Sequence, residues 1–224
     1  MKKYDNREEM KRSLLAGNLN SDNDDSWNVR YILDGATPDF ASHDYRIHSG
    51  ASKLCLRNDG GEYVCKWVTD DRYNEAVQEA KVYAKAVEAG LEKFFPYTEI
   101  AFEINGITFV FQEKVQYSAG RLPYSIRSKF LKQCKTSLDC EKRIWKKMER
   151  EFKRAGDKDY GRDLDQLWAC MALSIYGKKL CRKLCAFIVE NAINDLHTSN
   201  IGYNHNKPII LDFSGYDRGY YKNA

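Results

Sequence analysis

Two aspartates and one asparagine lie close together near residue 200, and their side chains suit phosphoryl transfer. Asp195 and Asn200 are separated by four residues, and Asp212 follows the apolar segment PIIL. A carboxylate can accept or orient the proton of an attacking hydroxyl, while carboxylate and amide oxygens are ligands for Mg²⁺. We therefore treat Asp195 as a candidate catalytic base, and Asn200 and Asp212 as candidate metal ligands. An Asx-rich turn between two strands is the simpler structural alternative.

Lys66 and Glu79 could supply a second part of the same chemistry. Lys66 is near the end of the predicted strand YVCKW, and Glu79 lies thirteen residues later in a predicted helix. A lysine that binds the phosphates of a nucleotide needs a helix carboxylate to hold its ammonium group in place. Glu75 lies one turn earlier on the same helix face, so the sequence leaves open which glutamate is the partner. Each charge alone would also be ordinary on a solvated surface.

A segment of small residues, Ser49-Gly50-Ala51-Ser52, joins the first two predicted strands. Small side chains there would let backbone amides approach phosphate oxygens closely. We count these four residues as candidate phosphate-binding positions, although many ordinary hairpins also contain one glycine.

The first half of the chain contains the elements that would position these residues. Residues 44–69 are predicted to form strand, glycine loop, strand, a tight turn at Asp59-Gly60-Gly61, and strand. Residues 98–115 are predicted to form a second hairpin around Asn105-Gly106. Between them, a helix over residues 73–91 is indicated by the spacing of Ala76, Ala80, Tyr83, Val87 and Leu91. We therefore expect a small antiparallel sheet with one helix inserted after its third strand.

The second half of the chain is predicted to be mainly helical. Ile144, Met148 and Phe152 form an apolar row at four-residue spacing beside Trp145. A buried helix over about residues 164–190 is indicated by Leu167, Met171, Leu180, Leu184, Phe187 and Ile188. The segments NIGYN and PIILDF then return to strands. The polar first 43 residues are expected to hold one possible helix, from Asn6 to Leu15.

Composition limits the class of protein. The 224 residues suit one domain or two joined lobes, and the hydrophobic content of 43% excludes global disorder. Seven cysteines, with no Cys-x-x-Cys spacing, favour a reducing cytoplasm and disfavour a disulfide scaffold or a zinc site. The net charge of +4 implies no polyanionic partner by itself. We expect no secretory signal, no membrane span and no membrane partner.

The order and placement of these residues resemble the protein kinase family over about residues 44–216. Val64-Cys65-Lys66 is similar to the family's Val-Ala-Ile-Lys strand, and Asp195–Asn200 is similar to its catalytic loop. Asp212-Phe213-Ser214 resembles the metal-binding Asp-Phe-Gly. The chain as a whole is most similar to the minimal kinases of bacteriophages and bacterial effectors.

The resemblance implies an α+β, bilobal, protein-kinase-like fold. A polar N-terminal extension would cover residues 1–43, and a small antiparallel-sheet N-lobe with one helix would cover residues 44–117. A reduced, mainly helical C-lobe would cover residues 118–224, including a basic helical insertion at about 118–163.

The resemblance also implies cofactors, partners and site residues. ATP and Mg²⁺ would be the cofactors, and a host protein would receive the γ-phosphate on serine or threonine in the host cytoplasm. Lys66, Glu79 and Asp195 would be catalytic, and Asn200 and Asp212 would bind the metal. Further contacts to ATP would come from Ser49, Gly50, Ala51 and Ser52, from the gatekeeper Gln112, and from the Glu113 carbonyl and the Val115 amide at adenine.

Several positions depart from the family's pattern. Of the three loop glycines only Gly50 remains, with His48 and Lys53 at the other two places. Ile193-Asn194 replaces the His-Arg before the catalytic aspartate, and Ser214 replaces the glycine of Asp-Phe-Gly. Only twelve residues follow Asp212, so we expect no activation segment and activity without phosphorylation of the chain itself.

Two other functions remain open. A small-molecule phosphotransferase is one alternative: aminoglycoside- and choline-kinase-like enzymes share His197, but so do phage-type kinases, so this residue does not decide. The expected lack of a C-terminal acceptor region disfavours this alternative. A pseudokinase or interaction module is disfavoured because Lys66, Asp195 and Asp212 are all present.

The basic stretch 127–154 bears on possible macromolecular partners. It has eleven Lys or Arg against four Asp or Glu. We favour a solvated helix face there over a docking surface for an acidic protein substrate. A nucleic acid partner is disfavoured because aromatic residues do not alternate with the basic ones.

Overall fold

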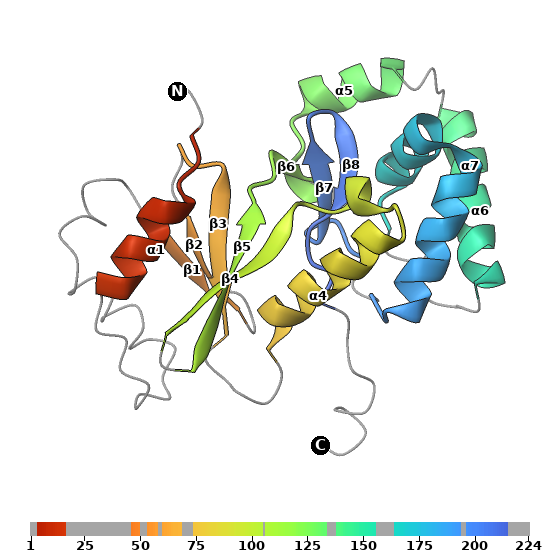
Figure 1. Ribbon diagram of the computed structural model, residues 1–224. Helices are drawn as coiled ribbons and strands as arrows, with labels where there is room; N and C mark the ends of the chain where they lie inside the picture. The colour runs from red at the N-terminus through yellow and green to blue at the C-terminus, as the bar shows by residue number, and fades with distance from the viewer. Residues whose placement is uncertain are drawn as a thin grey trace. The chain divides into compact units, whose positions relative to one another are not determined.

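The computed structural model describes residues 4–16, 46–49, 53–57, 60–68, 74–104, 106–133, 138–155, 164–193 and 196–214 (Figure 1). The chain divides into two compact units. The first comprises residues up to Tyr83 together with Tyr97–Lys114, and the second comprises Ala84–Pro96 together with the residues from Val115 onward. Both units mix helices with antiparallel strands, so the expected α+β class is confirmed.

The first unit contains a five-stranded antiparallel sheet with the order β1-β2-β3-β5-β4. Its strands are β1 (Arg46–Ser49), β2 (Leu54–Arg57), β3 (Tyr63–Trp67), β4 (Thr98–Ile104) and β5 (Ile107–Glu113). Gly106, with φ of 80°, follows the predicted turn position Asn105, which lies outside the described residues. A positive φ is readily adopted by glycine, which explains its use between β4 and β5. The predicted sheet, with one helix inserted after its third strand, is confirmed.

The two faces of this sheet have different chemistry. Successive residues of a strand point to opposite faces. In β3, Cys65 and Trp67 therefore point one way, while Val64 and Lys66 point the other. The first face is apolar, and its core comprises Met10, Leu14, Leu54, Leu56, Cys65, Trp67, Phe109 and Phe111.

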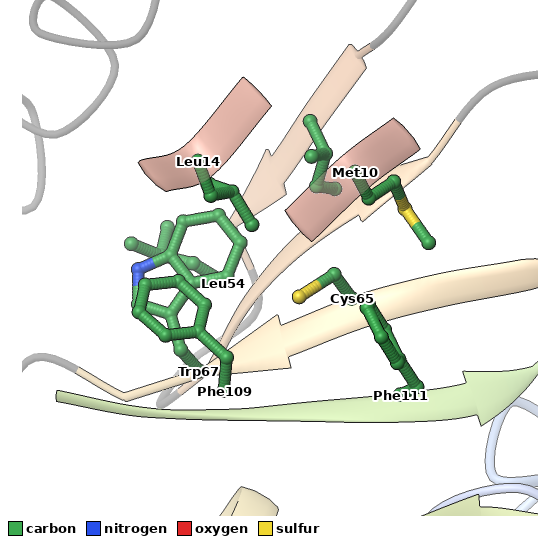
Figure 2. Close-up of a cluster of buried hydrophobic side chains, with 8 residues drawn as sticks. Met10, Leu14, Leu54, Cys65, Trp67, Phe109 and Phe111 are labelled. Atoms are coloured by element: carbon green, nitrogen blue, oxygen red, sulfur yellow. The ribbon is translucent and has the colours of Figure 1, made fainter. Parts of the chain in front are cut away.

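Helix α1 (Arg7–Ala16) covers the apolar face. Met10 and Leu14 are fully buried, and Figure 2 shows them over Cys65, Phe109 and the other labelled side chains. Burial of such a side chain stabilises the fold by roughly 2 kcal/mol. Residues 4–16 are therefore part of the first unit's core. Their polar composition concealed this, because Met10 and Leu14 are the helix residues that belong to this core, among mostly charged neighbours.

The segment before α1 is also fixed to the sheet. The buried Asn6 side chain donates to the Tyr63 carbonyl (3.2 Å) and accepts from the Tyr63 N–H (3.0 Å). Tyr4 forms a parallel bridge with Gly61. These backbone contacts hold the N-terminal segment beside the start of β3.

Helix α4 (Glu75–Glu88) packs on the second face of the sheet. It begins at Asn74, whose side-chain oxygen accepts from the Val77 N–H at 3.1 Å. Ala76 and Ala80 pack against Val68 and Val110. The boundary between the two units falls within this helix, after Tyr83.

The end of α4 also differs in detail from the sequence prediction. Gly90 has φ of 64°, and the Leu91 N–H bonds the Ala86 carbonyl at 2.7 Å. This is the Schellman arrangement that glycine favours at helix ends. Val87, expected on the apolar stripe, is 49% exposed, whereas Val82 and Ala86 are buried. The buried face therefore shifts from Ala76 and Ala80 toward Val82 and Ala86 along the helix.

The second unit contains three longer helices and a small sheet. The helices are α5 (Tyr124–Gln133), α6 (Leu138–Arg154) and α7 (Gln166–Glu190). The antiparallel sheet has the order β6-β7-β8, formed by β6 (Tyr117–Ser118), β7 (Ile201–Asn204) and β8 (Lys207–Ile210). Two short 3₁₀ helices, η1 (Glu92–Phe94) and η2 (Ala119–Arg121), complete it. Figure 1 shows α6 and α7 side by side, and the two helices pack together.

Helix α7 forms much of the core of the second unit. The Asp165 side chain caps its start by accepting from the Trp168 N–H at 2.9 Å. Of the six residues expected to be buried, five are, and Leu180 is half-buried. Gly177 breaks the helix with φ of 77° and ψ of 164°. On α6, Met148 and Phe152 are buried as expected, while the side chains of Ile144 and Trp145 lie outside the described part.

Within the described ranges, no helix is both long enough and apolar enough to pass through a membrane.

Candidate functional site

Lys66 and Glu79 form an ion pair on the second face of the sheet. Lys66 Nζ on β3 lies 2.8 Å from Glu79 Oε2 on α4. The Glu79 side chain has no exposed surface, whereas that of Lys66 is 13% exposed. The partner of Lys66 is thus Glu79 and not Glu75, the alternative that the sequence left open. A buried carboxylate needs such partners because leaving it unpaired costs several kcal/mol.

Lys53, just before β2, is a second partner of Glu79. Its Nζ lies 2.8 Å from Glu79 Oε1 and 3.5 Å from Glu75 Oε2. Lys53 was placed from the sequence only as a replacement for a loop glycine, and its pairing with Glu79 was missed. The register of β2 with β3 explains the pairing. Lys53 precedes Cys55 by two residues, Cys55 pairs with Lys66 across the strands, and alternate residues share a face.

Gln112 on β5 completes the surroundings of Glu79. Its side-chain amide donates to Glu79 Oε2 and to Thr98 Oγ1, each at 3.2 Å. Gln112 and Thr98 are themselves buried, at 4% and 3% exposure. Three side chains therefore donate to the two oxygens of one carboxylate. Thr98 was not anticipated from the sequence, since its role depends on the pairing of β4 with β5.

Cys55 on β2 pairs with Lys66 across the strands. Burial raises the pKa of the Cys55 thiol above its ordinary value, even though the Lys66 ammonium acts to lower it. Only the thiolate is a good nucleophile, so this shift disfavours nucleophilic chemistry at Cys55. The charged groups of this cluster are therefore two lysine ammonium groups, the buried Glu79 carboxylate and the partly exposed Glu75 carboxylate.

The remaining candidate residues of the first half are placed only in part. Ser49 ends β1, and Gly50, Ala51 and Ser52 lie outside the described residues. The Glu113 N–H donates to the Tyr97 carbonyl at 2.8 Å. Val115 is half-buried, just after β5. The roles expected for these residues stay predictions.

Asn200 and Asp212 are brought together by the β7–β8 hairpin. Asn200 comes directly before β7, and Asp212 comes two residues after β8. The Asn200 carbonyl accepts from the N–H groups of Leu211 (2.8 Å) and Asp212 (3.3 Å). The hairpin turns at His205 and Asn206, both at positive φ, as a tight two-residue turn requires. Two residues twelve apart in sequence thus become neighbours, as a shared metal ion would need.

The segment before Asn200 is a tight turn. The His197 carbonyl accepts from the Asn200 N–H at 2.9 Å, and His197 Nδ1 accepts from the Ser199 N–H at 3.1 Å. Leu196 is 1% exposed, which anchors the turn in the core of the second unit. Asp195, the candidate base, lies outside the described residues.

In the part of the chain that the structure describes, no group of three or more His, Cys, Asp or Glu side chains is arranged to hold a metal ion. The oxygens of Asn200 and Asp212 stay the candidate metal ligands predicted from the sequence, and water or a bound anion would have to supply the remaining ligands. Mg²⁺ commonly uses one or two protein carboxylates in this way.

The basic stretch lies on α5, α6 and the segment between them. On α6 the exposed residues include Lys146, Lys147, Arg150, Lys153 and Arg154. The same helix buries Glu151, which pairs with Arg154 on α6 and with Arg182 and Lys178 on α7. Arg154 thus belongs to the ion-pair cluster between α6 and α7. The exposed lysines and Arg150 form a solvated face of α6.

Comparison with protein family models, with curated proteins and with solved structures finds no match to this chain.

Proposed function

We propose that this chain is an ATP- and Mg²⁺-dependent phosphotransferase with a bilobal, protein-kinase-like fold. Its acceptor is the hydroxyl of a serine or threonine in a host protein, in the host cytoplasm. The observation that carries the proposal is the Lys66–Glu79 pair, in which a strand lysine is held at 2.8 Å by a helix carboxylate with no exposed surface. Phosphoryl transfer enzymes of this class need a lysine fixed in this way to bind the α- and β-phosphates.

Further support comes from the elements around the pair. An antiparallel sheet carries Lys66 on its third strand, and the helix inserted after that strand carries Glu79. Gln112, the expected gatekeeper, contacts the same carboxylate. The Glu113 carbonyl and the Val115 amide follow directly along the chain, in position for the edge of adenine. Residues 49–52 would cover the phosphates with backbone amides.

The second unit supplies the groups for metal binding and proton transfer. Asn200 and Asp212, neighbours at one end of the β7–β8 hairpin, would hold Mg²⁺, which neutralises charge on the transferred phosphate when bound. Asp195 would accept the proton of the acceptor hydroxyl and orient its oxygen. Five cysteines of the described residues are free thiols, in keeping with a reducing compartment.

The experiment that tests this function follows the label from γ-labelled ATP. The purified protein is incubated with labelled ATP and Mg²⁺, alone and with host lysate. Labelling of lysate proteins that occurs with Mg²⁺ and is lost when Mg²⁺ is omitted supports the proposal. Label on a small molecule instead identifies a small-molecule phosphotransferase. ATP binding without any transfer identifies a pseudokinase, and absence of both binding and transfer overturns the proposal.

A further inference from the structure

Glu79 is shared evenly by two lysines. Each of its two oxygens accepts from one ammonium group at 2.8 Å, Oε1 from Lys53 and Oε2 from Lys66. The two lysines come from neighbouring strand segments of the same sheet and point to the same face. By geometry alone, Lys53 stands in the same relation to the buried carboxylate as Lys66.

The exposure of the three side chains shows which charge a ligand would meet. The Glu79 side chain is 0% exposed, while those of Lys53 and Lys66 are 11% and 13% exposed. The Glu79 carboxylate is thus covered, and the accessible side-chain surface of the cluster is that of Lys53, Lys66 and Glu75, the last being 16% exposed. An ammonium group has three donors; Lys66 uses one on Glu79, and an anion at Lys53 would replace the longer 3.5 Å contact with Glu75. An approaching anion would therefore contact both lysines.

We propose that Lys53 is a second phosphate-binding lysine, paired with Lys66 through Glu79, and that the pair selects ligands with at least two linked phosphates. This inference rests on the proposed function and assigns a further ligand-binding residue to the same site. Both ammonium groups contact one carboxylate, so they are held close together. Linked phosphates present two negative charges at similarly short spacing, whereas a monophosphate can satisfy only one lysine well.

The position of Lys53 explains why the chain can tolerate a loop with one glycine. Lys53 stands where the resemblance places the third loop glycine, whose lack of a side chain lets the backbone approach phosphate. Here a charged side chain reaches the site from that position. A side-chain cation would thus replace part of the contact that backbone amides make.

The test compares the binding of ADP, AMP and inorganic pyrophosphate by titration calorimetry without Mg²⁺, which isolates the lysines from the metal site. Lys53→Gln should weaken ADP and pyrophosphate binding about tenfold or more, the usual effect of losing one charged hydrogen bond. AMP binding should change by less than about twofold, and Lys53→Arg should retain most of the ADP affinity because it keeps the charge. Lys81→Gln is the matched control, because it removes an exposed lysine from α4 in the same unit.

A second variant protects the test against loss of folding. Lys53→Gln with Glu75→Gln removes one cation and one anion, so the charge balance around Glu79 is kept. It should show the same selective loss of ADP and pyrophosphate binding, with thermal unfolding close to that of the wild type. Unfolding of both variants would overturn the inference, because Lys53 would then serve the fold and not the ligand.

The remaining outcomes separate the inference from the proposed function. Equal loss of ADP and AMP binding, or no loss of either, would overturn the role of Lys53 alone. If Lys66→Gln abolishes ADP binding and Lys53→Gln does not, the proposed role of Lys53 is overturned, and the proposed function is not. A wild-type protein that binds neither ADP nor pyrophosphate would overturn both.

Discussion

Glu79 has no exposed surface, and each of its carboxylate oxygens accepts a hydrogen bond from a different lysine. Gln112 donates to the same group, so the carboxylate is fully satisfied. A buried ion pair of this kind contributes little net stability, because desolvation offsets the attraction. The ion pairs mainly position the lysines, since the buried carboxylate fixes two flexible lysine side chains on one face of the sheet.

Replacement of Glu79 should therefore affect activity more than replacement of Glu75. Glu79→Gln removes the group that positions Lys66, and misplacement of a catalytic group can cost about a hundredfold in rate. Glu75→Gln leaves the contact of Lys66 intact and loses only a 3.5 Å contact to Lys53, so its effect should be several times smaller. The phosphotransfer rates of the two variants decide this. A larger loss at Glu75 would show that the wrong carboxylate has been assigned.

Replacement of Asn200 or Asp212 by alanine should affect the Mg²⁺-dependent part of ATP binding. Each alanine variant removes one oxygen ligand from a cation that tolerates little distortion, so each should weaken Mg²⁺-ATP binding. Thermal unfolding with ATP, measured with and without Mg²⁺, should show that the Mg²⁺-dependent part of the stabilisation is reduced in both variants. Asn206→Ala, at the other end of the same hairpin, is a control for damage to the turn. An intact Mg²⁺ effect in both variants would place the metal elsewhere.

At the scale of elements, the packing of α6 on α7 depends on Glu151. Burial acts to raise the pKa of this carboxyl, but the bond from Arg182 and the charges of Arg154 and Lys178 lower it by more, and the net shift is downward. A carboxyl with a lowered folded pKa stabilises the fold above its unfolded pKa. That stabilisation disappears as the pH falls through the folded pKa.

The pH dependence of unfolding tests this ion-pair cluster. Glu151→Gln should lower the free energy of unfolding by about 1 kcal/mol at pH 7, since its partners are half-exposed. The difference from the wild type should shrink as the pH falls below about 5, near the unfolded carboxyl pKa. Glu149→Gln, which loses only an exposed pair with Lys153, is the control with little effect. A difference that stays constant down to pH 3 would contradict this account.

Gly177 sets the shape of α7. Its φ of 77° and ψ of 164° lie in a region of backbone conformation that residues other than glycine hardly ever adopt. A Cβ there would meet no atom within 4 Å, so a substitution strains only the backbone. Gly177→Ala should cost roughly 1–3 kcal/mol in urea unfolding. The exposed Ser174→Ala on the same helix should stay within about 0.5 kcal/mol, and an equal effect of both changes would show that the break is not required.

Local patterns predicted the elements well because neighbouring residues decide them. Helix α4 has an Asn74 cap at its start and Gly90 at its end, and the hairpin of β4 and β5 is marked by Asn105-Gly106. Contacts between distant segments were not readable in the same way. The burial of Met10 against β3 depends on a segment more than 50 residues away, and nothing within α1 records it.

At the candidate site, too, local patterns were predicted and contacts that depend on strand pairing were not. Lys66 and Glu79 were predicted because a known chemical requirement links residues of these types on a strand and a helix. Lys53 was missed because its contact depends on the register of β2 with β3, which fixes the face on which it lies. The register is set by pairing across strands, and a single sequence does not record it.

At the scale of the whole molecule, the proposed machinery is divided between two compact units. The first unit holds Lys53, Lys66 and Glu79, and the second holds Asn200 and Asp212. In the proposed function, the first unit would bind phosphate and the second would bind metal, so the two properties can be measured separately. Phosphoryl transfer, as proposed, would need both phosphate binding and metal binding, together with Asp195 as the base.

The most direct test of phosphotransfer compares the wild type with Asp195→Asn. Asparagine keeps the shape of the side chain but cannot accept the proton of the acceptor hydroxyl. In the labelled-ATP assay with host lysate, we predict that this variant loses at least about a hundredfold in initial rate, in the range that general base catalysis contributes. Its affinity for ADP and its thermal unfolding should stay those of the wild type. Label transfer by Asp195→Asn at the wild-type rate would contradict the proposed mechanism.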